Sequence, residues 1–258
     1  MKKITMSQTI KEILEPIGIS AIISQELDFL DVGKDATTIS FISESRLKRI
    51  EDKGLNPWKD LRTEMKLGKF LMKHYGYKEE AVENIVNRYR MFYNFSFNGG
   101  DNIFEIVNGM DIAHWYDYKT YKTGGGSLNS SCMRFQSPER FLLYTGNPDK
   151  IKLVILKEDN KLIGRALLWI SDDGSLYLDR PYTRYDDDIL LYKLYAEKKN
   201  IYNYYSISKI PTNFQVTVKL ETVVNIPYLD SMHLQNGNVF RTNNIVHINQ
   251  TNEQHIDF

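Results

Sequence analysis

The chain has 258 residues, of which 42% are hydrophobic, and this content is enough for a folded core and too high for a disordered chain. The 33 Lys and Arg residues equal the 33 Asp and Glu residues, so the formal net charge of zero argues against a globally basic nucleic-acid-binding protein. A single cysteine excludes an internal disulfide and any zinc site that needs several cysteines, and it indicates a reducing compartment. Zero net charge also leaves little repulsion between copies, so homo-oligomerisation stays open.

The N-terminus does not predict secretion or membrane insertion. Met1–Met6 begins like a signal peptide, but Gln8, Lys11 and Glu12 interrupt the apolar run that should follow. The sequence contains no stretch of about 18 apolar residues, so we expect no membrane-spanning segment. These features predict a soluble protein that acts inside the cell.

The first 95 residues predict a mainly helical region, because apolar side chains recur at helical spacing and Gly or Pro follows most of the periodic stretches. The expected helices cover residues 7–15, 17–35 (only loosely helical), 43–53, 57–74 and 78–93. The β-branched stretch at residues 36–42 predicts the one strand of this region.

The clearest linker follows this helical region. Phe95–Asn102 reads F-S-F-N-G-G-D-N, and Gly99-Gly100 is typical of a flexible connection. We therefore divide the chain into a helical N-terminal region, residues 1–95, and an α+β domain, residues 96–258.

The second half of the chain is rich in predicted strands. Ile151–Lys157, Leu162–Ile170 and Ser175–Arg180 are separated by short polar turns, which predicts an antiparallel meander. Its strands are almost continuously apolar, so we expect both faces of the sheet to be covered. Further strands are expected at residues 103–107, 201–207 and 214–224, and further helices at residues 110–118, 137–145 and 186–198. The polar tail after residue 246 is expected to fray.

These elements predict the α+β class, with a helical N-terminal region followed by an antiparallel or mixed sheet with flanking helices. The meander and the helix after it echo the centre of acetyltransferases of the GNAT type, whose helix N-terminus holds the pyrophosphate of acetyl-CoA. The expected glycine-rich turn is absent here, and Tyr185-Asp186-Asp187-Asp188 stands in its place. Three acidic residues would repel a pyrophosphate, so no cofactor is predicted.

Six stretches of the chain carry a resemblance to a known family. They are N-P-W-K-D-L-R-T-E-M-K-L-G-K-F (Asn56–Phe70), D-I-A-H-W-Y (Asp111–Tyr116), G-S-L-N-S-S-C-M-R (Gly126–Arg134), K-L-I-G-R-A-L-L-W (Lys161–Trp169), L-D-R-P-Y-T (Leu178–Thr183) and Y-L-D-S-M (Tyr228–Met232). In this order they resemble an uncharacterised family of proteins from large tailed bacteriophages and related viruses, over about residues 36–232. The resemblance implies a viral origin and a place in the host cytoplasm, and it implies no particular chemistry.

Gly124–Phe135 contains the only cysteine and the only triple glycine of the chain. A nucleophilic Cys132 would need a cation or a base beside its thiolate, and Arg134 and His114 are the candidates. These three residues form the predicted catalytic set. Free cysteine is also among the most frequently buried residue types, so a structural Cys132 in the core is the alternative.

The same stretch and the strands after it contain candidates for binding an anion. Glycine N–H groups and serine hydroxyls can hold an oxyanion, although no G-K-[S/T] follows the glycines as a Walker loop would require. Arginine binds carboxylate or phosphate through its planar guanidinium. A flexible glycine loop and a satisfied Asp–Arg network are the structural alternatives. The predicted ligand-binding residues are Gly125, Gly126, Ser127, Ser131, Arg165, Asp179 and Arg180.

Basic residues recur at steps of three or four along the predicted helix at residues 57–74. This stripe predicts a surface for nucleic acid or an acidic partner, and a solvated helix face is the alternative. Its members are Lys59, Arg62, Lys66, Lys69 and Lys73. The five histidines show no H-x-x-x-H or H-E-x-x-H spacing, so no metal site is predicted.

Three functions remain open. The viral resemblance and the lack of a complete catalytic signature favour a phage-encoded binding or interaction protein. It would counteract a host defence system by binding either a host protein or a small anionic ligand such as a nucleotide signal. The second is a Cys132-dependent hydrolase or transferase acting on an anionic substrate, so enzymatic activity is undecided. The third is a nucleic-acid-binding module that uses the basic stripe.

Overall fold

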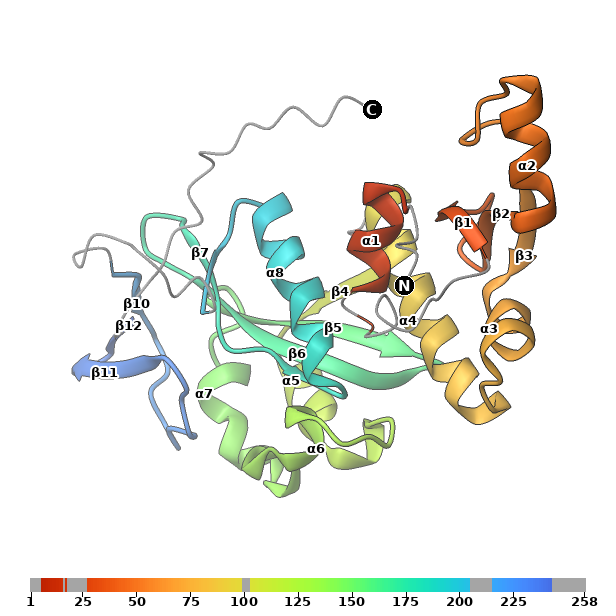
Figure 1. Ribbon diagram of the computed structural model, residues 1–258. Helices are drawn as coiled ribbons and strands as arrows, with labels where there is room; N and C mark the ends of the chain where they lie inside the picture. The colour runs from red at the N-terminus through yellow and green to blue at the C-terminus, as the bar shows by residue number, and fades with distance from the viewer. Residues whose placement is uncertain (1–5, 16, 18–26, 99–102, 205–214, 243–258) are drawn as a thin grey trace. The chain divides into compact units, whose positions relative to one another are not determined.

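The computed structural model describes residues 6–15, 17, 27–98, 103–204 and 215–242. The chain divides into two compact units, Met1–Asn102 and Ile103–Phe258 (Figure 1). Both units combine helices with β-sheet, which confirms the predicted α+β class. Within the described ranges, no helix is both long enough and apolar enough to cross a membrane.

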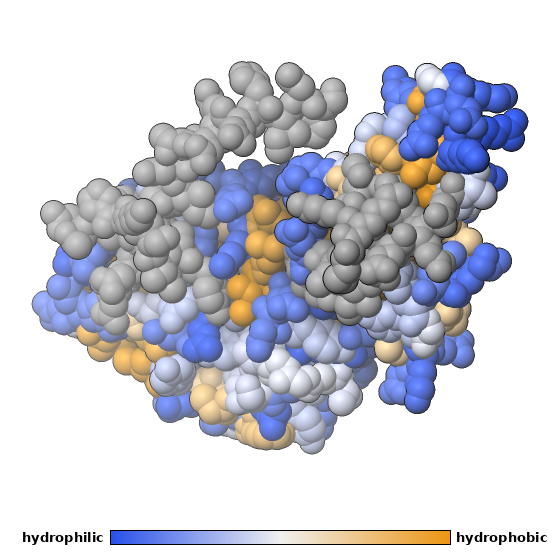
Figure 2. All heavy atoms as spheres, viewed as in Figure 1, coloured by the Kyte–Doolittle hydropathy of each residue, from blue (hydrophilic) through white to orange (hydrophobic). Residues whose placement is uncertain are grey.

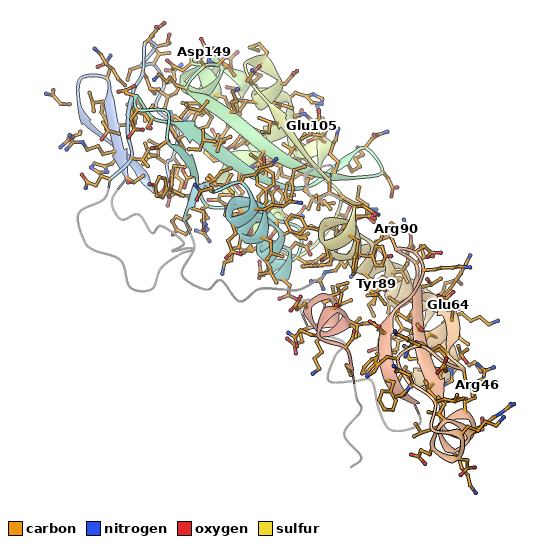
Figure 3. The ribbon with its side chains drawn as sticks, turned by 90° about the horizontal axis from the view of Figure 1, so that it is seen from above. Arg46, Glu64, Tyr89, Arg90, Glu105 and Asp149 are labelled. Atoms are coloured by element: carbon orange, nitrogen blue, oxygen red, sulfur yellow. The ribbon has the colours of Figure 1, made fainter. Side chains whose placement is uncertain are left out.

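The first unit is built on a three-stranded antiparallel sheet of order β1-β2-β3. Its described elements are α1 (Gln8–Leu14), β1 (Leu27–Val32), β2 (Thr38–Ser43), α2 (Glu44–Lys53), β3 (Thr63–Lys66), α3 (Leu67–Tyr75) and α4 (Glu79–Phe97). Tyr89 of α4 is buried, and its hydroxyl donates a hydrogen bond to the carbonyl of Thr38 at 2.9 Å (Figure 3). This bond fastens the longest helix of the unit to its central strand.

Helix ends in the first unit follow the local chemistry of the sequence. The Ser7 hydroxyl accepts a hydrogen bond from the backbone N–H of Ile10 and so caps α1. Gly54 and Gly76 end α2 and α3 with φ values of 60° and 65°, in the left-handed region that favours glycine. Hydrophilic residues dominate the visible surface of α2 (Figure 2).

Two expectations for the first unit are wrong. Residues 57–74 do not form one helix, because a turn after Asn56 leads into β3 and the helix begins only at Leu67. The Asn56 side chain accepts a hydrogen bond from the N–H of Trp58 at 2.9 Å, which closes a local turn, and β3 then pairs along β2. Part of residues 17–35 forms β1 instead of a loose helix, while residues 18–26 lie outside the described part of the chain.

The second unit is built on a six-stranded sheet. The main path has the order β4-β5-β6-β7-β9, and β8 also pairs with β6. All neighbours are antiparallel except β7 and β9, which are parallel and are connected through α8. The strands of this sheet are β4 (Phe104–Val107), β5 (Ile151–Glu158), β6 (Lys161–Ile170), β7 (Leu176–Leu178), β8 (Tyr182–Thr183) and β9 (Tyr202–Asn203). The predicted antiparallel meander is confirmed.

Helices and a second small sheet surround these strands. The helices are α5 (Met110–Tyr116), α6 (Ser127–Ser130), α7 (Leu142–Thr145) and α8 (Ile189–Lys198), and 3-10 turns cover Tyr118–Thr120, Cys132–Phe135, Pro138–Phe141 and Asp186–Asp188. The small antiparallel sheet has the order β10-β12-β11. Its strands are β10 (Thr217–Lys219), β11 (Met232–Asn236) and β12 (Val239–Thr242). The β11–β12 hairpin was not predicted, although its two-residue turn Gly237-Asn238 begins with a glycine, whose φ is 55°.

Both faces of the large sheet are covered, as the apolar strands predicted. Leu167 and Trp169 of β6 lie in a core that includes Ile112 of α5, Tyr144 of α7 and Phe240 of β12. On the other face, α8 lies so close to β6 that a Cβ at Gly164 would be 2.9 Å from the hydroxyl of Tyr192. Arg165 shares the parity of Leu167 and Trp169 and therefore projects toward the core face.

Candidate functional site

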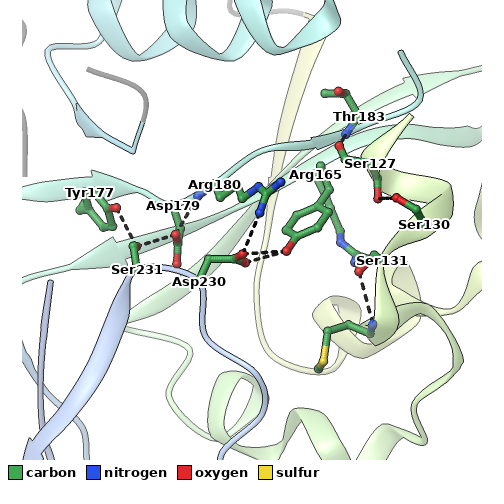
Figure 4. Close-up of polar contacts among 12 residues, drawn as sticks. Ser127, Ser130, Ser131, Arg165, Tyr177, Asp179, Arg180, Thr183, Asp230 and Ser231 are labelled. Carbon is green, nitrogen blue, oxygen red and sulfur yellow. Dashed lines mark hydrogen bonds and ion pairs between the residues drawn. The ribbon is translucent and has the colours of Figure 1, made fainter. Parts of the chain in front are cut away.

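Five separated stretches of the second unit meet on the core face, where β6 runs beside β8 (Figure 4). They lie at residues 111–116, 126–134, 161–169, 178–183 and 228–232, the same stretches that carry the family resemblance. Their polar side chains and one further tyrosine surround a single buried guanidinium. We call this group the arginine–tyrosine cluster, and its members are Tyr116, Tyr121, Arg165, Arg180, Tyr182 and Asp230.

Arg165 is the centre of the cluster and is only 1% exposed. Its guanidinium donates hydrogen bonds to the hydroxyls of Tyr121 and Ser131, the latter at 2.9 Å, and lies 3.8 Å from the ring centroid of Tyr116. Among the residues that the structure describes, no carboxylate forms an ion pair with it, and its Nε has no hydrogen-bond partner. Burial lowers the pKa of Arg165, yet a guanidinium stays protonated in proteins, so Arg165 holds a positive charge in the core without a direct ion pair.

The cluster reaches solvent at Arg180, Tyr182 and Asp230. Both carboxylate oxygens of Asp230 lie 2.8 Å from the hydroxyl of Tyr182, and one lies 3.6 Å from a guanidinium nitrogen of Arg180. The guanidinium carbons of Arg165 and Arg180 are 5.5 and 5.4 Å from the Tyr182 ring centroid. Arg180 is 40% exposed and Asp230 only 13%, and burial raises the pKa of Asp230. Arg180 is therefore the solvent-exposed cation of the cluster, and Arg165 is the buried one.

Asp179 lies next to Arg180 in the chain, at the end of a buried series of hydrogen bonds (Figure 4). Tyr177 donates to Ser231 at 2.7 Å, and Ser231 donates to Asp179 at 2.6 Å. The indole N–H of Trp169 and the backbone N–H of Arg180 also donate to this carboxylate, at 3.3 and 2.7 Å. Burial raises the pKa of Asp179 to about 6 despite these donors. Ser231 is thus positioned by Asp179, and no described histidine takes part in the chain.

The glycine–serine stretch closes the cluster from the side of β8. The hydroxyl of Ser127 accepts the backbone N–H of Thr183 at 3.0 Å, and the N–H of Gly126 donates to the carbonyl of Arg184 at 2.7 Å. A Cβ on Gly126 would be 2.5 Å from the carbonyl oxygen of Thr183, so glycine is required for this close approach. Gly125 is exposed, and a Cβ added to it would have no other part of the protein within 4 Å. The stretch is thus an ordered cover of the β8 edge.

The three predicted catalytic residues do not join this cluster. Cys132 is exposed, so the alternative of a structural cysteine in the core is wrong. The guanidinium of Arg134 lies 4.5 Å from the ring centroid of Phe135. His114 is exposed on α5, with its ring 4.9 Å from that of Trp115. None of the described contacts joins the Cys132 thiol to Arg134 or His114.

The predicted basic stripe does not lie on one helix, because its members are spread over a turn, a strand and α3. Lys59, Lys66, Lys69 and Lys73 are exposed. Arg62 is half-buried, and its guanidinium donates three hydrogen bonds. The acceptors are the hydroxyl of Ser40 at 2.6 Å, the carbonyl of Pro57 at 2.9 Å and the carbonyl of Phe29 at 2.7 Å. Arg62 therefore ties the turn after Asn56 to β1 and β2. Lys66, the N-cap residue of α3, keeps helical spacing with Lys69 and Lys73 on that helix, whereas Lys59 lies in the turn.

Five residues of the site were not identified from the sequence: Tyr116, Tyr121, Tyr182, Asp230 and Ser231. They have no recognisable spacing relative to Arg165, so local patterns could not place them beside it. For all of them except Tyr121, the available signal was their position in the five stretches that carry the resemblance. Each of those stretches supplies at least one polar side chain to the cluster or its hydrogen-bond chain, as the contacts above show.

Acidic residues stand at the N-terminus of α8, on the face of the sheet opposite the arginine–tyrosine cluster. Asp186, Asp187 and Asp188 stand where the helix α8 begins, and their charge opposes a pyrophosphate there. Ser127 and Gly126 occupy the backbone groups at the outer edge of β8. In the described part of the chain, no three His, Cys, Asp or Glu side chains are grouped closely enough to hold a metal ion.

Comparisons of this chain with protein-family models, curated proteins and solved structures give no match.

Proposed function

We propose that this chain is a phage-encoded binding protein that captures a small anionic ligand in the arginine–tyrosine cluster. In the host cytoplasm this ligand is a nucleotide signal of a defence system, and its capture weakens the defence. The viral setting rests on the resemblance of the six sequence stretches. The site itself rests on Arg165.

The observation that carries the proposal is the buried charge of Arg165 without a paired carboxylate. Burying an uncompensated guanidinium costs several kcal/mol, about 3–5 when a partner has been removed, and an apolar side chain of similar volume avoids this cost. A core that retains such a charge is expected to use it, and an oxyanion is its natural partner. The tyrosine and serine hydroxyls around it supply further hydrogen bonds, and aromatic rings suit a nucleobase.

The Cys132 enzyme and the nucleic-acid-binding module are supported by no comparable observation. The Arg134 guanidinium lies against Phe135, and the five basic residues proposed for nucleic acid do not lie on one helix. Capture of a small anion is therefore the function that the geometry supports best.

The proposal is tested by binding measurements on purified full-length protein. A panel of mononucleotides, linear dinucleotides and cyclic dinucleotides is titrated by calorimetry at constant ionic strength. At least one member is expected to bind the wild type, and Arg165→Met is expected to weaken that binding more than about tenfold, which corresponds to ~1.4 kcal/mol. Arg140→Met removes an exposed guanidinium of the same unit and should leave the affinity unchanged.

Two results would overturn the proposal. One is a wild type that binds no nucleotide at millimolar concentration. The other is an Arg165→Met variant that remains folded by circular dichroism and binds as tightly as the Arg140→Met variant. In the second case Arg165 has only a structural role.

A further inference from the structure

The solvent-facing edge of the arginine–tyrosine cluster, formed by Arg180, Tyr182 and Asp230, carries negative as well as positive charge. Asp230 lies 3.6 Å from Arg180, and its oxygens hold the hydroxyl of Tyr182. Tyr182 in turn packs within 5.5 Å of the Arg165 guanidinium. A ligand group that pairs with Arg165 must therefore enter close to the Asp230 carboxylate.

The site contains two cations and two carboxylates, and they differ in how closely they are paired. Arg165 and Arg180 supply two positive charges, and Asp179 and Asp230 supply two negative charges when both are ionised. The Asp179 carboxylate is already surrounded by the donors Ser231, Trp169 and the backbone of Arg180. Asp230 is bound by one tyrosine hydroxyl and a long ion pair, and it is the carboxylate nearer to solvent. The free cationic capacity is therefore about one charge, located at Arg165.

We infer that Asp230 is a specificity-determining residue, which restricts the site to singly charged oxyanions such as a phosphodiester or a carboxylate and rejects a doubly charged phosphate monoester. This inference rests on the proposed function, because it concerns the anion that Arg165 binds. The first negative charge is matched by Arg165. The second finds no free cation and is repelled by Asp230.

The size of the effect follows from the geometry of the contacts. Tyr182 joins the two groups, because its hydroxyl lies 2.8 Å from Asp230 and its ring centroid lies 5.5 Å from the Arg165 guanidinium. An anion on Arg165 would therefore lie within about one screening length, ~8–10 Å at ordinary ionic strength, of the Asp230 carboxylate. With an effective dielectric constant of about 20, each further negative charge lowers affinity by on the order of tenfold to a hundredfold. Removing the charge of Asp230 should return most of this loss for a dianion.

The test uses three small anions and the full chain. Dimethyl phosphate and acetate are singly charged, whereas methyl phosphate is doubly charged at pH 8 because its second pKa is about 6. Each is titrated at constant ionic strength and followed by amide chemical shifts. For the wild type we expect methyl phosphate to bind at least about tenfold more weakly than the better of the two monoanions. Which monoanion binds better distinguishes a phosphodiester from a carboxylate ligand.

Two neutral variants then test the role of Asp230. In Asp230→Asn, or in Asp230→Ser if the first does not fold, methyl phosphate should bind within about threefold of the better monoanion. Asp149→Asn makes the same charge change at an exposed site and should keep the wild-type preference (Figure 3).

The outcomes separate the two proposals. If the wild type binds methyl phosphate as well as the monoanions, or if the neutral variants keep the wild-type preference, the role of Asp230 is wrong while anion capture stands. If none of the three anions causes shifts that Arg165→Met abolishes, and the nucleotide panel also fails, the proposed function is wrong and the role of Asp230 falls with it.

Discussion

The buried carboxylate of Asp179 should make the stability of this protein depend on pH in a defined window. Burial raises the pKa of Asp179 from the ordinary 3.8 to about 6 in the folded chain. The folded state therefore holds this proton more tightly than the unfolded state does. Its contribution to the free energy of unfolding is fully present below about pH 4 and is lost as the pH rises through about 6.

The magnitude follows from the size of the shift. A rise of about two pKa units at about 1.4 kcal/mol per unit gives a loss of ~3 kcal/mol between pH 4 and pH 7. Asp179→Asn carries no charge at any of these pH values and should lack this loss. The free energy of unfolding of the wild type minus that of the variant should therefore fall by ~3 kcal/mol over the window.

Urea unfolding of both proteins, at one-unit steps from pH 4 to pH 8, measures this difference directly. Asp173→Asn is the matched control, because Asp173 is exposed and the hydroxyl of Ser171 lowers its pKa. The control should show no loss between pH 4 and pH 7. A difference curve for Asp179→Asn that is flat, or that rises with pH, would refute the assignment of a buried and ionisable carboxyl at this position.

Three further outcomes are expected. Gly126→Ala should lower the free energy of unfolding by ~1–3 kcal/mol in urea unfolding, because its Cβ would meet a backbone carbonyl at 2.5 Å, whereas Gly125→Ala, with open space, should be nearly neutral. Asn147→Ala should lower the free energy of unfolding by ~2–5 kcal/mol, because this buried side chain makes four hydrogen bonds to backbone groups. Asn238→Ala loses one such bond and should lower it by about 1 kcal/mol. Equal losses for the two variants in thermal unfolding would contradict the hydrogen-bond account. Cys132 should react with a maleimide in the native protein at a rate close to that of the unfolded chain, because its side chain is exposed. Slow labelling would show that the thiol is buried in the folded protein.

The retention of Arg165 in the core links stability to the proposed function. A guanidinium without a paired carboxylate weakens the free protein, and a bound anion supplies the missing partner. Ligand binding should therefore raise the melting temperature of the wild type. The free Arg165→Met variant should be no less stable than the free wild type, because removal of the buried charge offsets the loss of the hydrogen bonds to Tyr121 and Ser131.

Local sequence signals predicted the elements that depend on local chemistry. Ser7, Gly54 and Gly76 marked helix ends, and the apolar runs of the meander marked β5 and β6. The prediction failed where a distant strand decided the outcome. Thr63–Lys66 has residues that suit a helix, but β2 offers an open edge and the segment pairs with it.

The sequence by itself determined the α+β class, the antiparallel meander and the arginines and serines of the candidate site. It placed Arg165, Ser131, Asp179 and Arg180 among the ligand-binding candidates, because such residues are unusual within apolar strands and glycine-rich loops. Only the tertiary structure decided which of them meet. Side chains from five stretches, up to about 120 residues apart, form one cluster because α5 and α6, which precede β5, and the strands β10 to β12, which follow β9, pack on the core face of the sheet where β6 pairs with β8. Contacts of that range leave no periodic signal in the sequence.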